Sequence, residues 1–284
     1  MISRKAVLVL GASTLLIGVL CAQKPFRLYI SMEPYDNVPM PQDWQEKTEW
    51  VQARLMYPNH PEARFARGFF RGRMDWREGG TSWTQDYPRA DRHFASALRR
   101  LTRIHARSVE QPSNPDDLDD FFNWPWLVAG EMGDWLLTDA QVKTIREYLL
   151  RGGFIYMDDF WNADEYQRFA ESMNKVFPDR PVVEIENKDA IFHTVYDLDD
   201  RYQILGMWAL RGGGGAGGMW QRAAGTKGHW MGIYDDKNRL MVAMTFNNDV
   251  GDSWELADDP RYPERFSALG IRLGVNYVVY AMTH

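Results

Sequence analysis

The chain has 284 residues, of which 45% are hydrophobic and 25% are charged, and its formal net charge is −6. This balance excludes a disordered protein, and the length is sufficient for one large domain. The negative charge repels phosphate backbones, so we predict no nucleic-acid partner. The twelve tryptophans allow two interpretations, a well-filled core or an aromatic-lined surface groove.

The first residues have the pattern of an export signal. Arg4 and Lys5 precede an apolar stretch, residues 6–22, which has the length of a signal-peptide core and is short for a membrane-spanning helix. We predict cleavage near Ala22, with an uncleaved anchor or lipidation of Cys21, the only cysteine, as alternatives. In each case the rest of the chain is expected to be periplasmic or otherwise extracytoplasmic, and to meet the membrane only through this N-terminal segment.

After this leader (residues 1–22), the pattern divides into a lead-in and a domain. Residues 23–62 read as an extended, proline-marked arm followed by a helix that Asp43 can cap and that carries Leu55. Residues 63–284 are predicted to form a single α/β domain, with a first strand over residues 65–76.

The clearest structural signal lies in the middle of the chain. Thr138 and Gln141 form a capping-box pattern at the start of an amphipathic helix, which a pair of glycines ends. The short apolar run 154–157 then predicts a strand that delivers Asp158 and Asp159 at its carboxyl end. Ligands of open parallel sheets bind at this end of the strands, so we predict a pocket here. Because neighbouring residues of a strand point to opposite faces, we expect one carboxylate to face the pocket and the other to cap a helix or face solvent.

Two further polar motifs supply candidate pocket residues. The first, at residues 83–91, contains Asp86, Tyr87 and Asp91 around the start of a predicted helix, where helix capping is the alternative role.

The second motif, at residues 247–255, contains Asn248, Asp249 and Asp252. Its oxygen-rich side chains suit a hard cation, although the spacing is not that of an EF-hand and a turn stabilised by Asn and Asp needs no metal.

The second half of the chain reads as mainly extended. The sequence predicts strands over residues 182–185, 191–196 and 204–208, a hairpin of 230–234 with 240–246, and a last helix beginning at Pro263. The glycine run at 211–220 matches no phosphate-binding fingerprint and is interpreted as a flexible loop or lid.

In combination, these motifs resemble a bacterial family known as domain of unknown function 4159. The matching segments are 83–91, 152–159, 247–255 and 270–284. The resemblance implies a flavodoxin-like three-layer α/β/α sandwich, similar to class I glutamine amidotransferases, with a mainly parallel sheet and an added C-terminal hairpin and helix. Those enzymes use a cysteine after a central strand, whereas this strand ends in Met157, Asp158 and Asp159, so cysteine-dependent glutamine hydrolysis is excluded.

Three functions remain open at this point. The main hypothesis is a non-catalytic envelope protein that binds a small ligand, a glycan or another envelope protein. The alternatives are a carboxylate-dependent hydrolase, which can use a divalent cation, and a structural subunit of an envelope complex. The sequence contains no cofactor motif, and we predict no cofactor and no dedicated metal site.

The leader can be tested directly. If residues 1–22 are a cleaved signal peptide, intact-mass measurement of the protein isolated from its native host should place the N-terminus near Gln23. A mass that includes Met1 would instead support an anchor.

Overall fold

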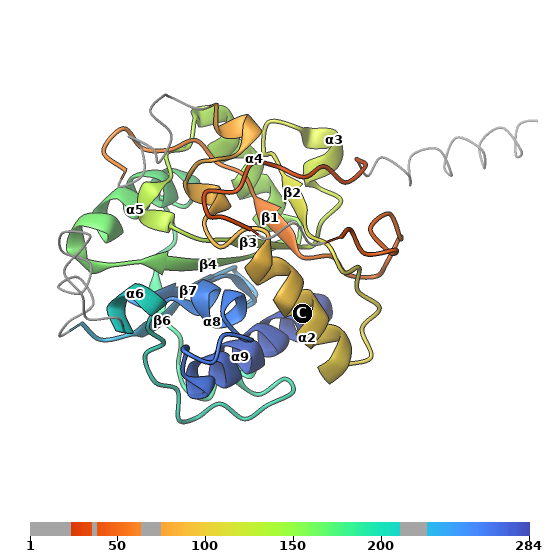
Figure 1. Cartoon of the computed structure of the whole chain (residues 1–284). Helices are drawn as coiled ribbons and strands as arrows, with labels where there is room; N and C mark the ends of the chain where they lie inside the picture. Colours follow the sequence, from red (N-terminus) through yellow and green to blue (C-terminus); the bar gives the residue numbers. More distant parts are fainter. Residues whose placement is uncertain (1–23, 36–38, 64–74, 211–225) are drawn as a thin grey trace, which may run out of the picture.

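The computed structural model describes residues 24–35, 39–63, 75–210 and 226–284, which form an α/β sandwich around one seven-stranded sheet (Figure 1). The strand order is β2-β1-β3-β4-β7-β6-β5. The strands are β1 (Ala53–Leu55), β2 (Gln111–Ser113), β3 (Trp126–Ala129), β4 (Phe154–Phe160), β5 (Val183–Glu184), β6 (His229–Tyr234) and β7 (Leu240–Phe246).

The sheet is mainly parallel. Strands β2, β1, β3, β4 and β7 all run in one direction, in the order of a flavodoxin-like sheet. Strand β6 pairs antiparallel with β7, as the predicted hairpin requires, and β5 adds an edge strand antiparallel to β6. The predicted fold class is therefore confirmed, and β7 proves to be a strand of the parallel core.

Helices cover both faces of the sheet, as Figure 1 shows. One face carries α2 (Arg89–Leu101), α8 (Val250–Glu255) and α9 (Glu264–Thr283), and the other carries α3 (Leu118–Phe121), α4 (Asp139–Leu150) and α5 (Asn162–Val176). The short helices are η1 (Trp76–Glu78), η2 (Ser82–Thr84), η3 (Met132–Asp134), η4 (Ala190–Phe192) and α6 (Met207–Leu210). No helix within the described ranges is both long and apolar enough to cross a membrane.

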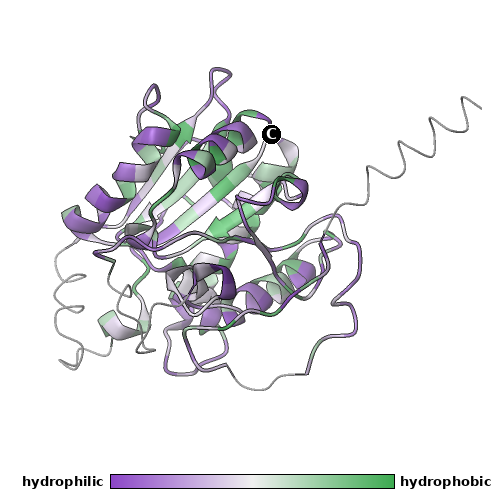
Figure 2. Ribbon diagram, turned by 90° about the horizontal axis from the view of Figure 1, so that it is seen from above, coloured by the Kyte–Doolittle hydropathy of each residue, from purple (hydrophilic) through white to green (hydrophobic). Residues whose placement is uncertain are grey.

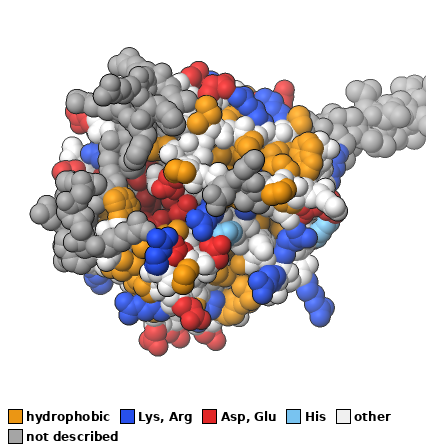
Figure 3. All heavy atoms as spheres, viewed as in Figure 1, with side chains coloured by type: hydrophobic (Ala, Val, Ile, Leu, Met, Phe, Trp, Pro, Cys, Tyr) orange, Lys and Arg blue, Asp and Glu red, His pale blue; other side chains and the backbone are white. Residues whose placement is uncertain are grey.

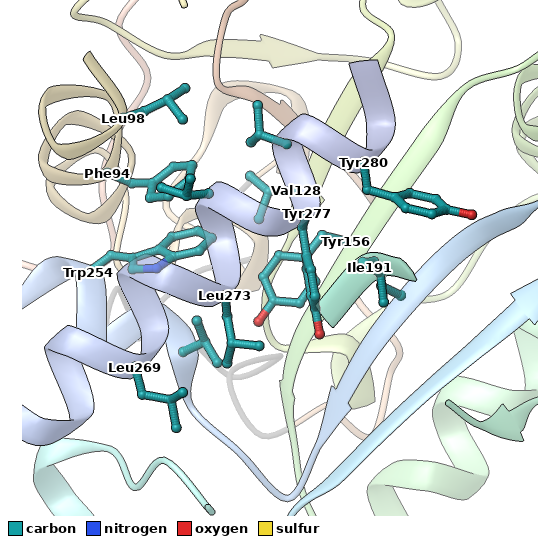
Figure 4. Close-up of a cluster of buried hydrophobic side chains, with 14 of the residues drawn as sticks. Phe94, Leu98, Val128, Tyr156, Ile191, Trp254, Leu269, Leu273, Tyr277 and Tyr280 are labelled. Atoms are coloured by element: carbon teal, nitrogen blue, oxygen red, sulfur yellow. The ribbon is translucent and has the colours of Figure 1, made fainter. Parts of the chain in front are cut away.

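The domain has two hydrophobic cores, one on each face of the sheet, because successive residues of a strand point to opposite faces. Trp126 and Val128 of β3 pack under α2 and α9, whereas Leu127 and Ala129 pack under α4 and α5. Figure 4 shows the first core, and Figure 2 shows the hydrophobic strands lying between more polar helices. Among the described residues, seven buried tryptophans belong to these cores, which favours the core interpretation of the aromatic content; they are Trp50, Trp83, Trp124, Trp126, Trp135, Trp230 and Trp254.

Local signals predicted several elements well. The Thr138–Gln141 capping box begins α4, Pro263 immediately precedes α9, and the hairpin forms as expected. Most of the strand predicted over residues 65–76 lies outside the described residues, as does the whole glycine run at 211–220.

Three predicted elements were wrong. Leu55 belongs to strand β1 rather than to a helix, and β1 lies within the 23–62 stretch that was expected to precede the domain. The strand predicted over 191–196 is a short 3-10 helix with a loop, and 204–208 leads into helix α6. In each case pairing or packing with distant residues decided the local structure.

A buried ion pair joins β1 to α2. Arg54 Nε lies 2.9 Å from Asp91 Oδ2, and both side chains are almost fully buried. Arg54 Nη1 also donates to the carbonyl oxygens of Trp83 and Gln85, so one guanidinium fixes the loop that precedes α2. Burial raises the pKa of Asp91 to about 6, and Arg54 opposes this shift.

This ion pair predicts that replacing Arg54 destabilises the protein more than replacing an exposed arginine does. Arg54→Met should lower the free energy of unfolding by about 3–5 kcal/mol, because it leaves Asp91 buried and unpaired. Arg89→Ala, which breaks an exposed pair with Asp258, should cost less than about 1 kcal/mol in urea unfolding. The double variant Arg54→Met/Asp91→Leu should recover much of the loss, and equal costs for the two single variants would contradict this role.

Candidate functional site

The carboxyl end of β4 is irregular, and this irregularity places two carboxylates together. The register between β4 and β7 shifts between Met157 and Phe160, and Asp159 has a positive φ of 53°. Such a bulge breaks the alternation of side chains along a strand. Asp158 is 3% exposed and Asp159 is 8% exposed, so neither faces solvent, and of the two alternatives for the second carboxylate the solvent-facing one is wrong.

Asp158 is held by two donors from neighbouring elements. The Thr245 hydroxyl of β7 donates to its Oδ1, and the backbone N–H of Gly251 donates to its Oδ2 at 2.7 Å. Thr245 Oγ1 in turn lies 2.8 Å from the hydroxyl of Tyr156. Asp159 accepts a hydrogen bond from the indole of Trp161 at 2.6 Å.

The motif after β7 brings two more carboxylates to this edge. Asp249 caps α8 by accepting the N–H of Asp252 at 2.8 Å, and Asp252 Oδ2 accepts the N–H of Met207, the first residue of α6, at 2.5 Å. Asn248 anchors the loop: its Oδ1 accepts the N–H of Ile204, and its Nδ2 donates to the carbonyl of Phe246.

Asp86 reaches the same place from the loop before α2. Its φ is 58°, a left-handed conformation that L-residues rarely adopt and that tends to persist where the surrounding structure holds it. Gly251 provides the space, because a Cβ there would lie 2.2 Å from Asp86 Oδ2 and 3.7 Å from Asp158 Oδ2. Gly206 does the same for Asp249, whose Oδ2 lies 2.0 Å from the position of its missing Cβ.

Two glutamates extend the group. Glu255 lies at the end of α8, and Glu33 comes from the N-terminal arm. One side-chain oxygen from each of Glu33, Asp86 and Glu255 lies within 4.8 Å of the other two. Together with the aspartates, these residues form what we call the acidic cluster: Glu33, Asp86, Asp158, Asp159, Asp249, Asp252 and Glu255. Figure 3 shows acidic side chains gathered in a recess of this face.

Burial and mutual repulsion favour the protonated form of five members of the cluster: Asp86, Asp158, Asp249, Asp252 and Glu255. Burial, with a contribution from Asp159, raises the pKa of Asp158 to about 7, and burial raises that of Asp252 to about 7. Burial and the nearby Glu33 raise the pKa of Glu255 to about 8. The pKa values of Asp86 and Asp249 are raised well above their usual range, by burial first and Asp252 second.

The arrangement matches the needs of a cation. One oxygen each from Asp86, Asp249 and Asp252 lie within 4.8 Å of one another. Within the described parts of the chain, no lysine, arginine or histidine forms an ion pair with these three carboxylates or with Asp158. The sequence predicts no dedicated metal site, whereas this geometry supplies a set of oxygens that could act as ligands.

The predicted site residues thus divide into two groups. Asp86, Asp158, Asp159, Asp249 and Asp252 come together in the acidic cluster. The other three predicted residues make structural contacts: Asp91 pairs with Arg54, Asn248 anchors a loop, and Tyr87 binds the N-terminal arm.

Sequence reasoning missed three residues at the site. Glu255 lies three residues after Asp252 on a predicted polar motif, and this helical spacing was a usable signal. Thr245 and Glu33 gave no such signal, because their contacts with the cluster depend on the tertiary fold.

Comparison with known families agrees with the motif resemblance. The family model described as "Domain of unknown function (DUF4159)" matches residues 74–282, so the chain belongs to this family. A search of curated proteins finds no match to the chain. The family description names no activity, and the function must be argued from the site itself.

The acidic cluster predicts an unusual pH dependence. Asp158, Asp252 and Glu255 have folded-state pKa values of about 7 to 8, above those of an unfolded chain, so the unfolded state releases protons first as pH rises. The contribution of these groups to the free energy of unfolding, measured in the presence of a chelator, should therefore be highest near pH 4 to 5. It should fall by several kcal/mol towards pH 8, because each group loses about 1.4 kcal/mol for each unit by which its pKa is raised on folding.

Urea unfolding at pH 5, 6, 7 and 8 measures this slope. Asp158→Asn should flatten it, whereas Asp200→Asn, which changes an exposed aspartate, should leave it intact. Stability that rises from pH 5 to pH 8 would contradict the assigned shifts.

Proposed function

We propose that this protein is an exported, non-catalytic binding domain whose acidic cluster binds a divalent cation. Export is inferred from the basic and apolar pattern of residues 1–22. The binding role is inferred from the carboxyl edge of the sheet, where ligands of this architecture bind.

One observation carries the proposal: among the described residues, four buried aspartates of the cluster form no ion pair with a lysine, arginine or histidine. Asp86 and Asp252 are 6% exposed, and Asp158 and Asp249 are 3% exposed. Burying a charged carboxylate is costly unless it is paired or bound to metal. Protons or a cation must offset this cost, and at neutral pH a divalent cation neutralises two carboxylates at once.

The distances also suit a metal. Oxygen ligands of Ca²⁺ lie 2.3–2.6 Å from the ion, so two ligands of one ion are at most about 5 Å apart. The oxygens of Asp86, Asp249 and Asp252 meet this limit, since all lie within 4.8 Å of one another. Asp86 lies in the loop before α2, and Asp249 and Asp252 lie at the start of α8. Both segments are attached to the sheet.

A carboxylate-dependent hydrolase is the second candidate function. It is favoured by the pKa values of Asp158 and Asp252, both about 7, which allow either group to donate or accept a proton near neutral pH. A cation-dependent turnover of ester or glycoside substrates that Asp158→Asn abolishes, without loss of cation binding, would select this candidate.

Cation binding predicts stabilisation by mass action. At pH 8, Ca²⁺ or Mg²⁺ at about 100 times its dissociation constant should add about 2.7 kcal/mol to the free energy of unfolding. For a domain of this size, the midpoint of thermal unfolding should rise by several degrees. Asp249→Asn should abolish the shift, and Asp200→Asn should preserve it. Wild-type protein whose midpoint responds to no divalent cation would refute the proposal.

A further inference from the structure

The N-terminal arm, residues 24–35, is attached to the domain along much of its length. Ile30 forms a parallel bridge with Gly79, and the N–H of Gly80 donates to the carbonyl of Ile30 at 2.6 Å. Further along, the N–H of Met32 donates to the carbonyl of Thr84 at 3.4 Å. The arm thus lies as an extended segment beside the loop that leads to Asp86.

Two residues of the domain are shaped for this contact. Gly79 has a φ of 88°, and a Cβ there would lie 2.5 Å from the carbonyl oxygen of Ile30. Tyr87 accepts the N–H of Tyr29 through its hydroxyl at 3.1 Å and the hydroxyl of Ser31 through its carbonyl at 2.6 Å. The course of the arm is therefore specified by the domain surface.

The attached arm delivers Glu33 to the acidic cluster. Gln85 Nε2 donates to Glu33 Oε1 at 2.8 Å, which fixes the carboxylate next to Asp86. Glu33 Oε2 is buried and accepts no hydrogen bond from any described residue. Its oxygens face the carboxylates of Asp86 and Glu255, so repulsion opposes attachment of the arm unless a proton or a cation lies between them.

We propose that the arm is a strap that supplies Glu33 to the cation site, so that arm attachment and cation binding stabilise each other. The proposal rests on the cation-binding function above and adds a residue and a form of regulation to it. Coupling of this kind is reciprocal, so the factor by which the attached arm raises cation affinity equals the factor by which the cation favours attachment.

Hydrogen exchange of the arm and Ca²⁺ titration, both on the full chain at pH 8, test the proposal. Ca²⁺ should slow exchange of the Ile30 and Met32 amides. Glu33→Gln should lower Ca²⁺ affinity about tenfold, the factor that 1.4 kcal/mol represents. Gly79→Ala, which displaces the arm but removes no carboxylate, should lower it by a similar factor.

The double variant Glu33→Gln/Gly79→Ala should bind Ca²⁺ as Gly79→Ala does, because Glu33 no longer reaches the site once the arm is displaced. Gly152→Ala is the matched control: its φ is 111°, but no atom lies within 4 Å of its added Cβ, so Ca²⁺ affinity should not change. Fast arm exchange in Gly79→Ala with wild-type Ca²⁺ affinity would overturn the proposal.

A measurement without Ca²⁺ separates this proposal from the function on which it rests. In a chelator at pH 8, Glu255→Gln should slow arm exchange, because it removes a charge that repels Glu33. If wild-type protein binds no Ca²⁺, the proposed function fails, and the same chelator experiment still decides whether the arm and the cluster are coupled. Unchanged arm exchange in Glu255→Gln would show that they are not.

Discussion

Repulsion between buried carboxylates is the constraint on which this site depends. Five aspartates meet at one edge of the sheet, although each prefers water or a positive partner. The surrounding structure counteracts this with directed hydrogen bonds: Gly251 and Thr245 bind Asp158, and the N–H of Met207 binds Asp252. Such bonds orient the oxygens and stabilise their charge, but no lysine, arginine or histidine among the described residues forms an ion pair with Asp86, Asp158, Asp249 or Asp252.

Unusual backbone conformations accompany the crowding of carboxylates at the site. Asp86, Asp159 and Asn247 all have positive φ: Asp86 lies in the loop before α2, Asp159 lies near the end of β4, and Asn247 directly follows β7. This conformation costs of order 1–3 kcal/mol for a residue other than glycine, and it tends to persist at functional sites. Asp86 and Asp159 both combine this conformation with a side chain that lies close to Asp249.

Sequence reasoning succeeded where the signal is local. The capping box of α4, the hairpin and the position of Asp158 at the end of a buried strand all depend on residues close in the chain. Sequence reasoning failed where contacts with distant residues determine the secondary structure. Strand β1 is three residues long and exists only through pairing with β2 and β3. Helix α6 likewise begins where Asp252, 45 residues away, accepts the N–H of Met207.

For a cation bound at the proposed site, the contacts of Asn248 would bear on ion selectivity. This fully buried amide binds Ile204, Phe246 and His229, and so locks the loop that carries Asp249. A locked loop cannot readily move its oxygens to suit ions of different radius. Mg²⁺ requires distances of 2.0–2.1 Å and Ca²⁺ accepts 2.3–2.6 Å, so a rigid cage discriminates by size. The side chain of Asn248, which would touch no ion, would thereby set which one fits.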